Sequence, residues 1–241
     1  MSMLTRHWAR NKGTAGPPGR TMWAIVVLLG LITVVSAGIR IAIDWPAIAA
    51  GTTPNEESYE YRYVTHPVLA YLHILPGIVY LVGAPLQLSR RFRERHLTVH
   101  RRLGRLLLPA GILAGVFAIV FGTLHSFGGW LEAVAAITFG AYFVTALVIA
   151  FRAIRCGDVT RHRRWMIRAF AVGLAVGTIR IWMALFMVFG MSLETSSAPA
   201  FWVSFPLHAV AAEIYLSCRP LPAHLHGRAG VHRRRRGAPP A

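Results

Sequence analysis

The sequence predicts an all-α membrane protein, a six-helix transmembrane bundle with both termini in the cytoplasm. Of its 241 residues, 55% are hydrophobic and only 15% are charged, whereas an average soluble domain has about 25% charged residues. A soluble fold of this size could not hide so much apolar surface. The net charge of +17 is concentrated between long apolar stretches, so charge and apolar residues are segregated along the chain.

The six apolar stretches are the predicted spans. Each has about 18 or more residues, which is enough for a helix to cross the hydrocarbon core while satisfying its own backbone hydrogen bonds. In chain order they are Trp23–Ala42, His66–Leu88, Leu103–Leu124, Trp130–Phe151, Trp165–Gly190 and Ala200–Ser217. A signal peptide is the alternative for the first stretch, but its length of about 20 residues exceeds the usual apolar run of 7–15 and favours a retained helix.

Basic residues predict the orientation. Of the 26 lysines and arginines, 23 lie before the first span, in two alternate connections or in the tail. The opposite connections carry Arg62 and six acidic residues: Asp44, Glu56, Glu57, Glu60, Glu132 and Glu194. The positive-inside rule therefore places both termini in the cytoplasm and the protein in the cytoplasmic (inner) membrane. We expect a basic segment over residues 1–21, a membrane domain over 22–217 and an Arg-rich disordered tail over 218–241.

The basic connections favour a lipid partner. Their arginines are divided among four segments that flank membrane spans, which indicates topology and contact with anionic headgroups, and we expect no nucleic acid. Two segments place His-Arg-Arg at the start of an outgoing helix, where anions are favoured. The expected anion-binding residues are Arg101, Arg102, Arg163, Arg164 and Arg168.

Several polar positions also carry a family resemblance. The run from His66 to His73, the segment from Gly83 to Gln87, the two His-Arg-Arg segments, Arg180 and Glu213 together resemble a family of predicted bacterial membrane proteins catalogued as domain of unknown function 2306. The resemblance covers about residues 65–217 and implies no established activity. The matching positions are His73, Gln87, His100, His162, Arg168, Arg180 and Glu213, while His208 departs from the pattern.

The second predicted span carries a polar stripe. His66, His73, Tyr80 and Gln87 recur every seven residues, so they share one helix face. Such a face is unfavourable in lipid and is expected to point into the bundle. With a rise of ~1.5 Å per residue, His73, Arg180 and His208 fall at similar depths, and Glu213 lies ~7–8 Å closer to the cytoplasm.

Haem b is one hypothesis for these residues. A low-spin haem needs two neutral imidazoles at similar depth on opposite sides of the iron. His73 with His208 meets the depth condition, His66 with His125 is a surface-level substitute, and His100 with His162 is an inner pair. Arg180 and the basic loops would bind propionates. The protein would then pass electrons between quinol and a membrane redox partner, in outline similar to cytochrome b561-type bundles.

The alternative is a polar core or cavity that binds lipid or another small molecule, or a protein that assembles a membrane complex. Arg180 is then expected to face the bundle interior with Glu213, His73 or His208 as its polar partner. A proton-coupled transporter with Glu213 as carrier would require inverted repeats, and no convincing repeat is found. The sequence contains no Walker loop, dinucleotide motif or His-Glu-x-x-His site. It identifies no catalytic residue, no metal ligand apart from those of haem iron and no oligomeric state.

Overall fold

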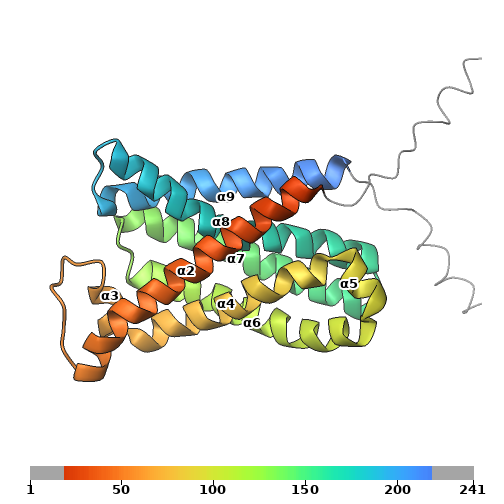
Figure 1. Cartoon of the computed structure of the whole chain (residues 1–241), viewed down its shortest axis with the longest axis horizontal. Helices are drawn as coiled ribbons and strands as arrows, with labels where there is room; N and C mark the ends of the chain where they lie inside the picture. Colours follow the sequence, from red (N-terminus) through yellow and green to blue (C-terminus); the bar gives the residue numbers. More distant parts are fainter. Residues whose placement is uncertain (1–18, 219–241) are drawn as a thin grey trace, which may run out of the picture.

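The computed structural model describes residues 19–218 and confirms the predicted all-α class. Six long helices lie side by side in the bundle (Figure 1), and each is long and apolar enough to cross a membrane. They are α2 (Arg20–Ala50), α4 (Pro67–Leu88), α6 (Leu97–Leu124), α7 (Gly129–Arg155), α8 (Val159–Val188) and α9 (Leu193–Cys218). Two short helices, α3 (Tyr61–Thr65) and α5 (Arg90–Arg95), lie in connections at opposite ends of the bundle.

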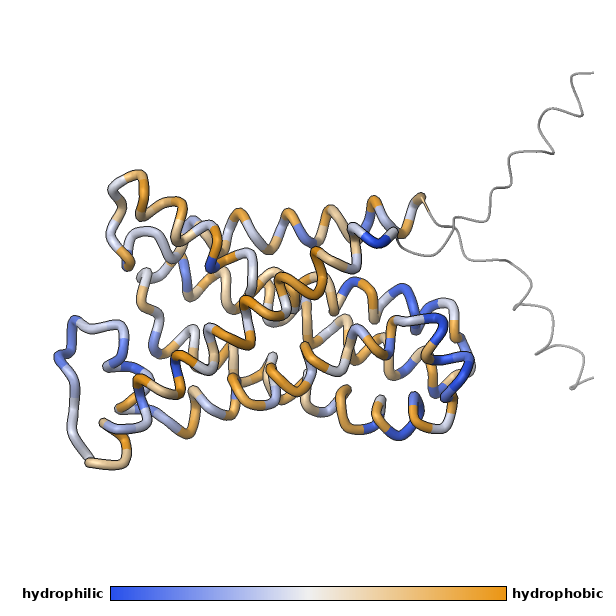
Figure 2. The backbone as a smooth tube through the Cα atoms, in the orientation of Figure 1, coloured by the Kyte–Doolittle hydropathy of each residue, from blue (hydrophilic) through white to orange (hydrophobic). Residues whose placement is uncertain are grey.

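We call these two ends the α3 end and the α5 end. The start of α2 and the end of α9 both point toward the α5 end, as an even number of spans requires (Figure 1). Hydrophilic residues gather at the two ends, and the middle of the bundle is mainly hydrophobic (Figure 2). The assignment of the α5 end to the cytoplasm stays a prediction. The flanking segments expected at residues 1–21 and 218–241 lie almost wholly outside the described residues.

The helices extend beyond the apolar stretches from which they were predicted. α2 continues to Ala50 through Pro46, and α6 and α8 begin at Leu97 and Val159, in the basic segments. The side chain of Asp158 caps α8 by accepting a hydrogen bond from the Arg161 backbone N–H at 2.8 Å. Hydropathy marks the part of a helix that fits in hydrocarbon, whereas capping and backbone hydrogen bonds set where it begins and ends.

The core lies where α4, α7 and α8 meet. Its central side chain is Tyr80, which is 2% exposed and packs edge-on against Phe143 with ring centroids 5.4 Å apart. α2 crosses the bundle diagonally (Figure 1). It approaches α8 closely at Gly177, where an added Cβ would lie 2.5 Å from the Leu29 carbonyl oxygen. α2 thus packs against both α4 and α8. A larger residue at Gly177 would push α2 and α8 apart.

Candidate binding cavity

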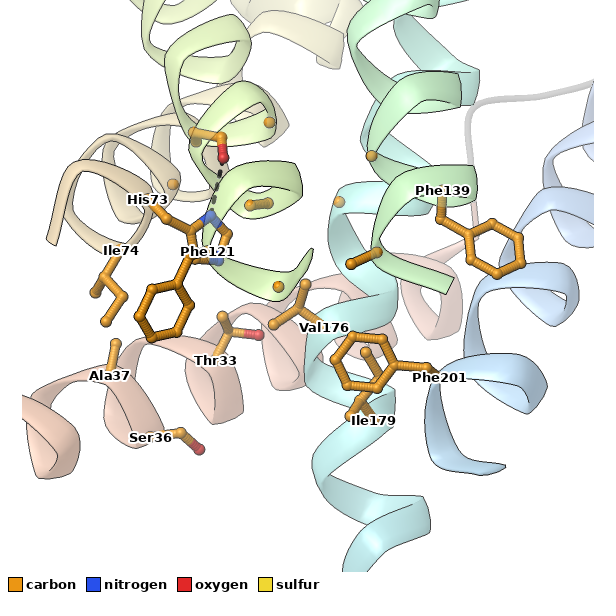
Figure 3. Close-up of a pocket in the computed structure, with 18 of the residues that line it drawn as sticks. Thr33, Ser36, Ala37, His73, Ile74, Phe121, Phe139, Val176, Ile179 and Phe201 are labelled. Atoms are coloured by element: carbon orange, nitrogen blue, oxygen red, sulfur yellow. Dashed lines mark hydrogen bonds between the residues drawn. The ribbon is translucent and has the colours of Figure 1, made fainter. Parts of the chain in front are cut away.

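A cavity of about 230 Å³ extends from the α3 end into the bundle. α2, α4, α6, α7, α8 and α9 all contribute to its walls, which are largely apolar and aromatic (Figure 3). Its polar lining consists chiefly of Arg40, Arg62, Arg180, Tyr59, Tyr63, Tyr80, His73 and Glu132. Three arginines therefore line one partly open cavity inside the bundle, where an unbalanced charge is expensive.

Arg62 is held by aromatic rings and one carboxylate. Its guanidinium lies 4.4 Å from the Tyr59 ring centroid and 5.1 Å from that of Tyr63, within the range of cation–π attraction. It donates hydrogen bonds to the His125 carbonyl at 3.0 Å and to Glu132 at 3.3 Å. Its charge is thus matched within the protein.

Glu132 anchors this part of the site. The residue is 4% exposed. Besides Arg62 it accepts hydrogen bonds from the Gly128 backbone N–H at 2.8 Å and from the Ser197 hydroxyl. One buried carboxylate therefore links α7, α9 and the segment that contains α3.

Arg40 is also matched by acidic groups. It pairs with Asp44 one turn along α2, and with Glu60 at 3.4 Å. Asp44 is fully buried and also accepts a hydrogen bond from Tyr71 on α4 at 3.2 Å. The Arg40 guanidinium carbon lies 5.0 Å from the centroid of the Tyr63 ring. Like Arg62, this arginine has carboxylate partners.

Arg180 differs from the other two arginines. Among the ion pairs formed within residues 19–218, none involves Arg180. Its guanidinium contacts the Met183 sulfur at 4.0 Å and interacts with the Tyr59 hydroxyl. The prediction that Arg180 faces the interior is confirmed, since it lines the cavity. Its polar neighbour is a tyrosine from the connection before α3.

The neighbouring arginines change the pKa of the Tyr59 hydroxyl. Burial alone would raise its pKa, but the positive charges of Arg180 and Arg62 outweigh burial and lower the pKa of Tyr59 to about 8. Tyr59 is therefore largely neutral at pH 7 and does not cancel the charge of Arg180.

Glu213, one of the three candidate partners expected for Arg180, pairs with a different arginine. Glu213 binds Arg168 with two hydrogen bonds, at 2.6 and 2.9 Å. The antiparallel packing of α8 and α9 brings these two residues together, twelve positions along α8 from Arg180. The headgroup-binding role expected for Arg168 must therefore compete with an internal ion pair.

The polar stripe on α4 is confirmed as an interior face. Tyr80 and Gln87 are buried, and His73 lines the cavity. The His73 Nδ1 atom lies 2.9 Å from the Ala114 carbonyl oxygen (Figure 3). With Nδ1 as donor to that carbonyl, Nε2 carries the lone pair. His208 is not a lining residue; its Nε2 lies 2.7 Å from the Thr178 hydroxyl. The structure thus does not place His73 and His208 in one cavity.

The other two histidine pairs are brought together. The rings of His66 and His125 pack edge-to-face with centroids 3.8 Å apart. An iron between them would need roughly 4 Å between the ligating nitrogens alone, so these rings pack directly on each other. His100 and His162 lie within electrostatic range at the α5 end. In the same region Arg101 and Arg102 are exposed, and Arg163 and Arg164 are partly buried.

Sequence reasoning missed Arg40, Tyr59 and Tyr63, and treated Asp44 and Glu132 only as markers of topology. A signal for two of these five was present, because Arg40 and Asp44 are four residues apart near the end of an apolar stretch. Such spacing predicts an ion pair on one helix face. Nothing in the sequence indicated that the connection before α3 folds against the bundle interior.

The fold and the cavity define a multi-pass helical membrane protein with a polar, partly aromatic site inside the bundle. Residues 70–216 match the family described as "Predicted membrane protein (DUF2306)", and the chain belongs to this family. The resemblance seen in the sequence is therefore confirmed. The matched region contains His73, Glu132 and Arg180, whereas Arg40 and Tyr59 precede it. No curated protein and no solved structure is significantly similar to the chain.

Proposed function

We propose that the protein binds an anionic amphiphile in the bundle cavity, with the acidic headgroup at Arg180 and the hydrocarbon chain along the apolar wall. The observation that carries the proposal is the position of Arg180 in a cavity without a carboxylate partner in the described part of the chain. A bare arginine inside a membrane costs at least ~2.5 kcal/mol, and an anionic headgroup would remove that cost.

A second polar group supports the same ligand. The Tyr80 hydroxyl is buried, has no hydrogen-bond partner and belongs to the cavity lining. Buried polar groups without a partner are rare and destabilising. The Tyr80 ring lies beside Gly173, two turns along α8 from Arg180, so a second polar atom of the ligand would satisfy this hydroxyl while the acidic group binds Arg180.

The apolar wall supports an amphiphile in preference to a free ion. Phe121, Phe139, Phe143 and Phe201 line the cavity together with aliphatic residues of α8. Pockets that bury a drug-sized molecule measure roughly 300–1,000 Å³, and this cavity of about 230 Å³ suits a headgroup with part of a chain. Membrane lipids in the cytoplasmic membrane, the expected location, are the natural source of such a molecule.

The test uses dodecanesulfonate brominated at the end of its chain, which is anionic at every working pH. Bromine quenches tryptophan on contact, and Trp182 packs beside the cavity-lining residues Ile179 and Met183. In an uncharged detergent we expect saturable quenching by the sulfonate and not by the matched brominated dodecanol.

Arg180→Gln should weaken sulfonate binding by roughly 10-fold or more, because a charge-assisted hydrogen bond contributes about 1.5–3 kcal/mol. Arg168→Gln is the matched control, since Arg168 lies on the same helix and pairs with Glu213 outside the cavity. Equal quenching by the alcohol, or unchanged affinity in Arg180→Gln, would overturn the proposal.

Haem b remains the second hypothesis, and His73 is the observation that favours it, because this histidine lines the cavity and its Nδ1 contacts the Ala114 carbonyl oxygen. A macrocycle would require the helices around that cavity to separate. A reduced-minus-oxidised absorption spectrum of the purified protein decides between the two classes of ligand, since a band typical of haem b, lost in His73→Ala, would favour the redox function over the amphiphile.

A further inference from the structure

A second group of unsatisfied polar atoms lies at the α5 end, away from the cavity. Gln87, at the end of α4, is 8% exposed, and its Nε2 donor has no hydrogen-bond partner. The Nδ1 atom of His100, in the first turn of α6, is also buried and unpartnered. Polar atoms buried in this way usually point to something that completes them.

The two unpartnered atoms, one on α4 and one on α6, lie on helix faces that meet. A Cβ added to Gly104 would lie 3.7 Å from the Gln87 Oε1 atom, so the Gln87 side chain faces α6. Gly104 is one helical turn from His100, and residues four apart share a helix face. Gln87 and His100 therefore converge on the same region between α4 and α6.

Cationic groups surround this region. Arg93 of α5 and His162 of α8 both lie within electrostatic range of His100. Burial and the neighbouring Arg163 lower the pKa of Arg93, which indicates that positive groups are crowded there. His162 is fixed by a 2.9 Å contact between its Nδ1 and the Ala150 carbonyl oxygen.

The nearby carboxylates do not balance these cations. Glu94 forms an exposed pair with Arg90 at 2.6 Å, and Asp158 caps the first turn of α8. A group that could complete Gln87 and His100 must therefore accept hydrogen bonds and carry negative charge.

We propose that a phosphate group binds between α4, α5, α6 and α8, held by Arg93, His100, His162 and Gln87. Arginine and histidine donors suit a tetrahedral anion that offers several acceptor oxygens. The amide of Gln87 donates one further hydrogen bond from the buried side. The phosphate belongs either to a lipid headgroup or to a soluble phosphate compound, and its chemistry at the protein is the same.

The experiment measures retention of two ³²P-labelled probes, phosphatidic acid and inorganic phosphate, on the full chain in an uncharged detergent. Arg180→Gln serves as the background, so that binding in the amphiphile cavity is weakened and contributes less. Retention of phosphatidic acid alone identifies a lipid headgroup, and retention of inorganic phosphate identifies a soluble ligand. Both outcomes support the site, whereas absence of retention with both probes overturns it.

Two variants test the assigned residues. Arg93→Gln should reduce affinity by roughly 10-fold or more, and Arg95→Gln is the matched control because Arg95 is exposed on the same short helix. Gln87→Met should also lose the labelled phosphate while the ligand-free protein keeps its unfolding temperature, because the Gln87 Nε2 donor has no hydrogen-bond partner there. Equal retention in Arg93→Gln and Arg95→Gln, or a large loss of unfolding temperature in ligand-free Gln87→Met, would contradict the proposal.

Discussion

Replacing Glu132 with Gln is the most direct test of the polar network at the α3 end. The Glu132 side chain is 5% exposed and receives three donors, the Arg62 guanidinium, the Gly128 N–H and the Ser197 hydroxyl. Glutamine keeps one acceptor oxygen and turns the other into a donor. At least one N–H or O–H donor then faces an amide donor, and Arg62 loses its carboxylate.

Breaking a buried ion pair by removing one partner costs about 3–5 kcal/mol. We expect about 3 kcal/mol here, because the aromatic rings around Arg62 retain part of its stabilisation. At roughly 2–4 °C per kcal/mol for a chain of this size, the midpoint of thermal unfolding in detergent should fall by roughly 6–12 °C. Circular dichroism at a helical wavelength measures this midpoint.

Glu94→Gln is the matched control for Glu132→Gln. It removes the same charge from an ion pair whose side chains are 79% and 59% exposed, so solvent already screens the interaction and no measurable change is expected. If the two variants unfold at the same temperature, the network at the α3 end does not hold the bundle together and the reasoning fails.

Three further predictions follow from other parts of the chain. Reporter fusions after Gly51, Gly128 and Ser197 should report the outer side, and fusions after Arg93, Gly157 and Ala229 the cytoplasm; a cytoplasmic signal at Gly51 would contradict the topology. Gly177→Ala should destabilise the protein by about 1–3 kcal/mol because its Cβ would lie 2.5 Å from the Leu29 carbonyl oxygen, whereas Gly38→Ala, with nothing within 4 Å, should not. Binding of brominated dodecanesulfonate should weaken roughly tenfold between pH 7 and pH 9, because Tyr59 has a pKa of about 8 and its ionised form repels an anion; in Tyr59→Phe the affinity should not follow this pH profile.

The helices could be predicted because the signal for them is local. A run of about 18 apolar residues satisfies both the length and the hydrogen-bonding requirement of a span by itself. The interior face of α4 could be predicted for the same reason, since the seven-residue spacing of His73, Tyr80 and Gln87 needs no knowledge of other helices.

The partners of the buried residues could not be predicted, because the depth of a residue in the membrane does not determine the direction in which its side chain points. Counting residues placed Arg180 and His208 at similar heights, yet His208 bonds Thr178 and Arg180 turns into the cavity. Which side chains meet depends on how each helix is rotated about its own axis, and many core contacts set that rotation. Tyr59 was missed for a different reason, since the path of a connection carries no periodic signal.

The contrast among the arginines separates a structural role from a binding role. Arg62 and Arg168 each meet a carboxylate within hydrogen-bonding distance, so their charges are matched in the folded protein. If residue 180 served only to pack the bundle, an apolar side chain in place of arginine would make the protein more stable, because it avoids the cost of burying a charge. Arg180 instead keeps its charge in a cavity that has a largely apolar wall and also contains the unpartnered Tyr80 hydroxyl. An arrangement of this kind costs stability while the cavity is empty and regains it when an anion enters, so ligand binding should raise the unfolding temperature of the wild-type chain more than that of Arg180→Gln.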